Sequence, residues 1–202
     1  MTPAQAKTPP LVLVHGLWDS PRLFRQLRLA LHGRRDPLLI PHLPHGLGHR
    51  PLETLAAQLG EHIEAAFGAE QPVDVLGFSM GGLIARTWLQ MQGGHRRTRR
   101  FISVASPHRG TPTALPWPRW LVAGIDDMKP GSPLLRRLAA DLAPLQRIEC
   151  LSFYCPTDLM VVPGWGAVLP VGPARPLPAL LHGRVLATPA CVRELVRELL
   201  RP

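Results

Sequence analysis

The chain has 202 residues, of which 46% are hydrophobic, and 23 basic against 14 acidic residues give a formal net charge of +9. This length fits one globular domain with a sizeable core, and because the chain has no run of 18 apolar residues we expect no transmembrane helix. All but two of the basic residues are arginine, and they are scattered rather than interleaved with aromatic side chains, so we expect no nucleic-acid partner.

The first half of the chain alternates short apolar runs with helical patterns. Residues 11–14 are wholly apolar, which predicts a strand buried on both faces, and residues 37–40 predict a second strand. Helices are expected over 22–32 and over 52–67, where apolar residues recur at helical spacing and Gly68 follows as a C-cap.

The second half repeats this alternation without an internal repeat or a low-complexity linker. The sequence therefore predicts a single α/β domain over residues 1–202, with a mostly parallel sheet. The segment 111–147 is proline-rich and then helical around 133–142. The other expected elements are strands over 72–78, 101–105, 148–154 and 167–171 and helices over 80–92 and 189–200.

Ser79 stands between an expected strand and an expected helix, in Gly77-Phe78-Ser79-Met80-Gly81. A sharp strand-to-helix turn forces such a serine into a strained backbone conformation, and side chains at the flanking glycine positions would collide with neighbouring backbone. The hydroxyl then projects above the C-terminal edge of the sheet, beside the free N–H groups of the helix. The pattern favours a nucleophile elbow over a coincidental Gly-Ser turn.

Several stretches together resemble the α/β-hydrolase family, and more closely its small bacterial lipases and esterases. They are Val14-His15-Gly16-Leu17, Gly77 to Gly82, Ser106-Pro107-His108-Arg109-Gly110-Thr111, and the aspartate and histidine signals described next. The resemblance covers nearly the whole chain. It implies an α/β-hydrolase fold with helices on both faces of a mostly parallel central sheet, a short cap insert at about 111–147, and chemistry that needs no cofactor.

The resemblance also implies a catalytic triad in the chain order serine, acid, histidine. Asp158 follows the strand 148–154 in a loop similar to the family's acid loop, and His182 is the only histidine after it. His182 would be the base that activates Ser79, and Asp158 would orient it. One departure is that Leu181, rather than the usual glycine, precedes the histidine. Other aspartates are expected to be surface or capping residues: Asp126, Asp127 and Asp141.

Acyl transfer passes through an oxyanion, which needs fixed N–H donors. The N–H of Met80, next after the nucleophile, is one donor by geometry. The turn His15-Gly16-Leu17 resembles the family's turn in which the residue after the glycine, here Leu17, donates the second. His15 itself is expected to hold the loop. The predicted pocket residues are Trp18, Phe78, His108, Trp117 and Trp120.

Two interpretations stay open for Trp117 and Trp120. They lie three residues apart, so on a helix they would share a face that lines an acyl-chain pocket or touches a lipid surface. Equally, they would pack the insert against the core. The arginine-rich composition leaves contact with an anionic membrane surface open as well.

The histidines and cysteines do not predict a metal site. No cysteine or carboxylate completes a ligand set near the loop that holds His42, His45 and His49. The three cysteines, Cys150, Cys155 and Cys191, have no metal-ligand spacing, and their odd number favours a reduced, cytoplasmic protein. The first ten residues do not resemble a secretory signal, which agrees with this location.

The sequence thus predicts a lipase or esterase that cleaves carboxylic esters through an acyl-serine intermediate, with a small ester or lipid as substrate. A thioesterase or an acyltransferase would use the same residues, so the fold and triad do not settle the substrate. A hydrolase-fold binding protein without turnover is a further alternative.

Overall fold

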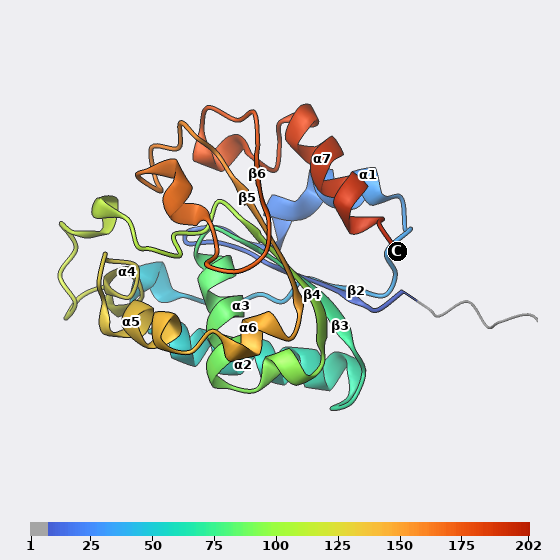
Figure 1. Cartoon of the computed structure of the whole chain (residues 1–202), viewed down its shortest axis with the longest axis horizontal. Helices are drawn as coiled ribbons and strands as arrows, with labels where there is room; N and C mark the ends of the chain where they lie inside the picture. Colours follow the sequence, from blue (N-terminus) through green and yellow to red (C-terminus); the bar gives the residue numbers. More distant parts are fainter. Residues whose placement is uncertain (1–7) are drawn as a thin grey trace, which may run out of the picture.

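The computed structural model describes residues 8–202, in which six parallel strands form one sheet between two layers of helices (Figure 1). The strand order is β2-β1-β3-β4-β5-β6, and every neighbouring pair is parallel. This arrangement confirms the predicted fold class. The strands are β1 (Leu11–Val14), β2 (Leu38–Leu39), β3 (Val73–Phe78), β4 (Thr98–Val104), β5 (Glu149–Tyr154) and β6 (Ala174–Pro176).

Helices cover both faces of the sheet (Figure 1). On one face lie α1 (Arg25–Leu31) and α7 (Pro189–Leu199); on the other lie α2 (Leu52–Phe67), α3 (Met80–Met91), α5 (Pro133–Ala140) and α6 (Ala143–Gln146). No helix in the described part of the chain is long and apolar enough to cross a membrane.

The wholly apolar sequence of β1 is explained by the helices that cover both faces of the sheet. Val12 and Val14 belong to the hydrophobic cluster under α2 and α3, whereas Leu11 and Leu13 belong to the cluster under α1 and α7. Because successive side chains of a strand point to opposite faces, a strand covered on both sides has no polar position.

One predicted strand, 167–171, is wrong. Leu169 of this run is buried in the core, and its N–H donates to Ser152 Oγ over 2.9 Å instead of joining the sheet. The edge strand β6 lies just beyond Gly172, which has a φ of +77°. All three side chains of β6 are exposed, so the strand has no apolar alternation for sequence reasoning to detect.

The insert expected at 111–147 lies between β4 and β5. The helix predicted around 133–142 is α5, which begins after the capping hydroxyl of Ser132. The short α4 (Ala123–Asp126) precedes it, and residues 115–121 form turns. Cys150, Cys155 and Cys191 are free and buried; the cytoplasmic location stays a prediction.

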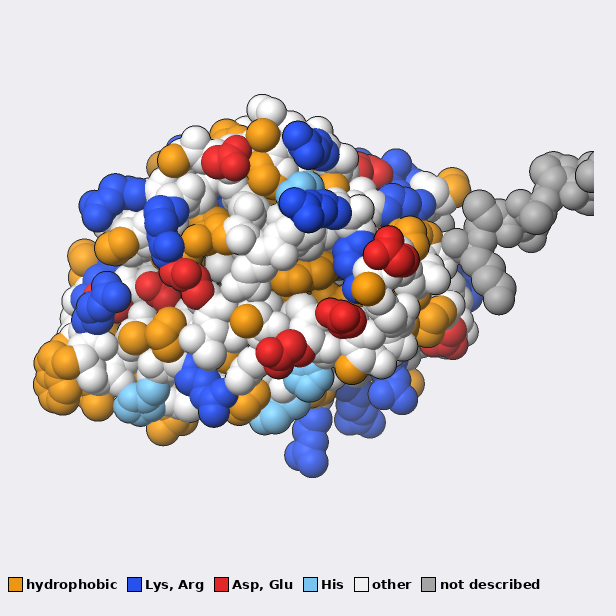
Figure 2. Space-filling view, turned by 90° about the horizontal axis from the view of Figure 1, so that it is seen from below, with side chains coloured by type: hydrophobic (Ala, Val, Ile, Leu, Met, Phe, Trp, Pro, Cys, Tyr) orange, Lys and Arg blue, Asp and Glu red, His pale blue; other side chains and the backbone are white. Residues whose placement is uncertain are grey.

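Figure 2 views the molecule from below Figure 1, on the side where α2 and α6 lie. Basic side chains are spread over this face, with acidic side chains between them. Hydrophobic side chains gather at its left end, which is the end where Figure 1 draws the insert.

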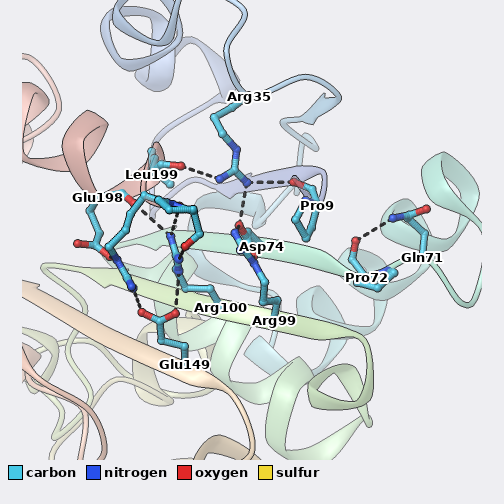
Figure 3. A network of polar contacts seen from close by, with 12 residues as sticks. Pro9, Arg35, Gln71, Pro72, Asp74, Arg99, Arg100, Glu149, Glu198 and Leu199 are labelled. Carbon is cyan, nitrogen blue, oxygen red and sulfur yellow. Dashed lines mark hydrogen bonds and ion pairs between the residues drawn. The ribbon is translucent and has the colours of Figure 1, made fainter. Parts of the chain in front are cut away.

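The N-terminal edge of the sheet carries a network of ion pairs and hydrogen bonds around the buried carboxylate of Asp74 and the buried side chain of Arg100 (Figure 3). Asp74 of β3 accepts hydrogen bonds from Arg35 over 2.8 Å and from Arg99 over 2.6 Å. Arg100 of β4, with its side chain 1% exposed, donates to the backbone carbonyl of Glu198 in α7 over 3.1 Å. We call these five residues the basal network, and they tie the loop before β2 and the end of α7 to the sheet.

Candidate active site

Ser79 lies at a sharp turn between β3 and α3. Its φ of +53° and ψ of −128° form a strained conformation for a residue with a side chain. A Cβ on Gly77 would lie 2.5 Å from the Cα of Gly82, and a Cβ on Gly82 would overlap Ser106 Oγ. Only glycine fits these positions, which is why the elbow has the predicted glycine pattern.

Three side chains from separate loops form one line of hydrogen bonds. Ser79 Oγ lies 2.8 Å from His182 Nε2, and His182 Nδ1 lies 2.7 Å from Asp158 Oδ2. The other carboxylate oxygen of Asp158 accepts the N–H groups of Met160 and Val161 over 2.8 and 3.1 Å. The structure therefore brings together the three residues predicted as a triad.

Opposing effects act on the carboxyl group of Asp158, which is only 4% exposed. Burial alone would raise its pKa, but the hydrogen bond and charge of His182, with the two backbone N–H groups, hold the pKa below its usual value. The ionised carboxylate accepts the Nδ1–H of the imidazole. This leaves Nε2 as the acceptor that faces the hydroxyl of Ser79.

The loop after β1 approaches the elbow closely. A Cβ on Gly81 would overlap the carbonyl oxygen of Val14, and a Cβ on Gly16 would lie 3.0 Å from Ser79 Cβ. Leu17 follows directly. Among residues 8–202, neither its N–H nor that of Met80 has a backbone acceptor, so both predicted donors are free at this edge.

Two histidines fix this loop. His15 Nε2 accepts the N–H of Leu43 over 3.1 Å, and His45 Nε2 accepts the N–H of Trp18 over 3.0 Å. Burial lowers the pKa of both imidazoles, which favours the neutral, hydrogen-bond-accepting form. These contacts fit the structural role predicted for His15. Within residues 8–202, no group of three His, Cys, Asp or Glu side chains is placed to hold a metal ion.

A cavity of about 420 Å³ opens beside Ser79. Of the predicted pocket residues, Trp18, Phe78 and Trp117 line it. A larger hollow of about 1100 Å³ beside α1 and β2 contains none of the triad residues. The smaller cavity is lined by Leu17, Trp18, Asp19, Phe78, Ser79, Pro107, Thr111, Thr113, Ala114, Trp117, Ile125, Met128, Met160, His182 and Gly183.

Two residues predicted to line the pocket, Trp120 and His108, do not reach it. Trp120 is 85% exposed and lies in a turn, because the prolines on both sides of Trp117 prevent the helix that would align the two indoles. His108 is buried under the turn after β4, with Nε2 2.6 Å from Ser103 Oγ. Burial, with the charge of Arg86, lowers the pKa of His108 well below its usual value.

No sequence pattern singles out Asp19, yet it lines the cavity with Ser79 and His182. Burial raises the pKa of its carboxyl group, and the charge of His182 opposes this only in part. The one available signal is its position, two residues after Leu17 in the loop that follows β1.

The sequence model of the family described as "alpha/beta hydrolase fold" matches residues 9–128. Among known proteins, the chain is 30% identical over 123 residues to lysosomal thioesterase PPT2 of Homo sapiens, and 29% identical over 116 residues to that of Mus musculus. The human match covers 59% of this chain and 40% of the relative. The chain thus spans about two fifths of the length of these relatives.

Solved structures of two lipases share the architecture. The mature form of Bacillus licheniformis lipase BlEst2 superposes with a TM-score of 0.75 at 16% identity, covering 96% of this chain and 93% of that one. Aspergillus fumigatus lipase B superposes with a TM-score of 0.73 at 18% identity, covering 96% of this chain and 53% of that one. At these identities the likeness shows the fold alone.

Proposed function

Since the chain belongs to the α/β-hydrolase family, we propose that it is a serine hydrolase that cleaves carboxylic esters, with Ser79, His182 and Asp158 as its catalytic triad. The observation that carries the proposal is the continuous line of hydrogen bonds from the Asp158 carboxylate through the imidazole to the Ser79 hydroxyl. The strained elbow and the two free backbone donors beside it support the same chemistry.

In the first step, Ser79 Oγ attacks the ester carbonyl carbon while His182 Nε2 takes its proton. Asp158 stabilises the resulting imidazolium. The N–H groups of Leu17 and Met80 donate to the oxyanion of the tetrahedral intermediate. His182 then gives its proton to the leaving alcohol, and the acyl group stays on the serine. Water then attacks the acyl carbonyl carbon while His182 takes its proton, and His182 returns that proton to Ser79 Oγ as the carboxylic acid is released.

The cavity favours an apolar acyl group. Ala114, Ile125 and Met128 of the insert line it, and Trp117 contacts Trp18 edge-on with ring centroids 6.2 Å apart. The insert is short, so we expect an open site that accepts esters of differing size.

A thioesterase is the second candidate, because the relatives at about 30% identity are named thioesterases. The same serine, histidine and backbone donors would attack a thioester carbonyl. Comparing kcat/KM for an oxygen ester and a thioester of the same acyl chain separates the two activities, and transfer to an added alcohol detects an acyltransferase.

Exposed apolar side chains stand on the loops that form the site. Leu180 and Leu181 directly precede His182, and Leu159 directly follows Asp158. Together with the basic composition, they support the proposal that the site contacts an anionic lipid surface. Other exposed large apolar side chains on these loops are Trp18, Leu115, Trp117, Trp120, Leu121, Met160 and Trp165.

The direct test of the proposed activity is Ser79→Ala. We expect kcat for a short-chain nitrophenyl ester to fall by about five to six orders of magnitude, with an unchanged far-UV circular dichroism spectrum. Ser20→Ala is the matched control, because the Ser20 side chain caps no helix, and it should keep its activity. Activity retained by Ser79→Ala would refute the proposal.

A further inference from the structure

The active-site cavity is lined by one carboxylate, Asp19, which the triad does not use. Asp19 follows β1 by five residues and lines the cavity together with Ser79 and His182. The position that a Cβ on Gly16 would occupy lies 3.1 Å from Asp19 Oδ2 and 3.0 Å from Ser79 Cβ. The carboxylate therefore lies beside the proposed nucleophile.

This carboxylate differs from the other buried acids of the chain. Asp74, Asp158 and Glu198 each pair with arginine or histidine side chains. Within residues 8–202, no hydrogen bond or ion pair reaches the half-buried carboxylate of Asp19, and none of the residues that line its cavity is arginine or lysine. A negative charge that enters the cavity would thus meet a carboxylate with no arginine or lysine beside it.

The chemistry of the proposed reaction indicates which part of the substrate Asp19 meets. His182 must hand its proton to the leaving-group oxygen, so the leaving group lies beside the imidazole. Asp19 and His182 line the same cavity, and the Asp19 carboxylate lies beside Ser79, so a leaving group held against the imidazole shares this cavity with the carboxylate. We therefore expect Asp19 to meet the alcohol part of an ester.

We propose that Asp19 is a specificity-determining residue, which disfavours esters with an anionic leaving group and favours those whose alcohol carries a cation. This inference rests on the proposed ester hydrolysis at Ser79. The carboxylate attracts a positive group and repels a negative one at the point where the leaving group departs, while neutral esters are affected less.

The test uses three butyrate esters of meta-substituted phenols, which carry a carboxylate, a neutral amide or a trimethylammonium group. Their kcat/KM values are measured at 0.15 M salt for the wild type and for Asp19→Asn. For each protein, kcat/KM of the charged ester is divided by kcat/KM of the neutral ester, and the ratio in the variant is compared with the ratio in the wild type, which cancels the intrinsic reactivity of the esters. In Asp19→Asn we expect this ratio to rise about tenfold for the anionic ester and to fall about tenfold for the cationic ester.

Glu61→Gln on α2 is the matched control, because it removes the same charge from an exposed side chain of a helix. Its ratios should equal those of the wild type if Asp19 acts at close range. Asp19→Glu keeps the charge and should keep the wild-type order of the three esters. If Asp19→Asn does not fold, Asp19→Ser is measured in the same way.

Wild-type ratios in Asp19→Asn, with normal turnover of the neutral ester, would overturn the role of Asp19 and leave the proposed esterase intact. Equal shifts in Glu61→Gln would also overturn it, since they would reflect net charge alone. If the wild type hydrolyses none of the three esters and Ser79 takes up no fluorophosphonate, both this inference and the proposed function are wrong.

Discussion

The polar groups at the two edges of the sheet differ in whether they have partners. At the N-terminal edge, Asp74 is surrounded by Arg35 and Arg99, and each charge has a partner (Figure 3). At the C-terminal edge, the N–H groups of Leu17 and Met80 have no backbone acceptor in the described chain. At the first edge the buried charges are paired, whereas the second keeps two backbone N–H donors without a backbone acceptor.

This difference indicates that one edge of the sheet contributes mainly to stability and the other mainly to activity. A buried polar group with all its partners holds neighbouring elements in place, whereas one that lacks partners costs free energy unless a ligand supplies them. We therefore expect substitutions at the basal network to lower stability, and substitutions at the C-terminal edge to lower activity.

Among the substitutions that test this comparison, the largest effect should follow Asp158→Asn. The asparagine cannot hold the imidazole of His182 in the tautomer that accepts the Ser79 proton, so kcat should fall about 10⁴-fold. Initial rates on a soluble ester measure this, with Asp127→Asn as a control at a half-buried aspartate of the insert. A loss below about tenfold would show that Asp158 does not orient the base.

The next largest effect should follow Asp74→Asn at the N-terminal edge, and it should be on stability. Asp74→Asn leaves Arg35, whose side chain is 2% exposed, without its counter-charge, so the free energy of unfolding should fall by about 3–5 kcal/mol. Urea unfolding at neutral pH measures it. The folded variant should keep its kcat, and a variant that loses activity at unchanged stability would contradict the separation of the two edges.

The smallest effect on the folded enzyme should follow Trp120→Ala. Trp120 is 85% exposed, so stability should change by less than about 0.5 kcal/mol and soluble-ester turnover should stay constant. Binding to anionic vesicles, measured by sedimentation, should weaken about tenfold. Leu29→Ala on α1, also an exposed apolar side chain, is the control. Equal weakening by both would contradict a lipid contact at the active-site edge.

Sequence reasoning succeeds where one residue pattern has one structural solution. The glycines around Ser79 allow a close approach that no other residue permits, and chain order leaves His182 as the only histidine after Asp158. The wholly apolar β1 likewise has to be covered on both faces.

Features that depend on tertiary contacts could not be predicted from the sequence. All three side chains of β6 are exposed, and the strand is held by its ladder with β5 and by the ion pair of Arg175 with Glu198, so its residues carry no apolar pattern. Asp19 looks like a surface loop residue in the sequence and becomes part of the cavity only because Gly16 lets the loop pack against the elbow. Trp117 and Trp120 have helical spacing, yet the prolines around them impose turns.

Fluorophosphonate labelling tests most directly whether folding makes Ser79 a nucleophile. The reagent is incubated with the wild type and with His182→Ala, and the modified peptide is located by mass spectrometry. We predict one adduct, on Ser79, in the wild type and none in His182→Ala, since the serine needs the imidazole to take its proton. An unlabelled wild type, or an adduct on another residue, would contradict the account.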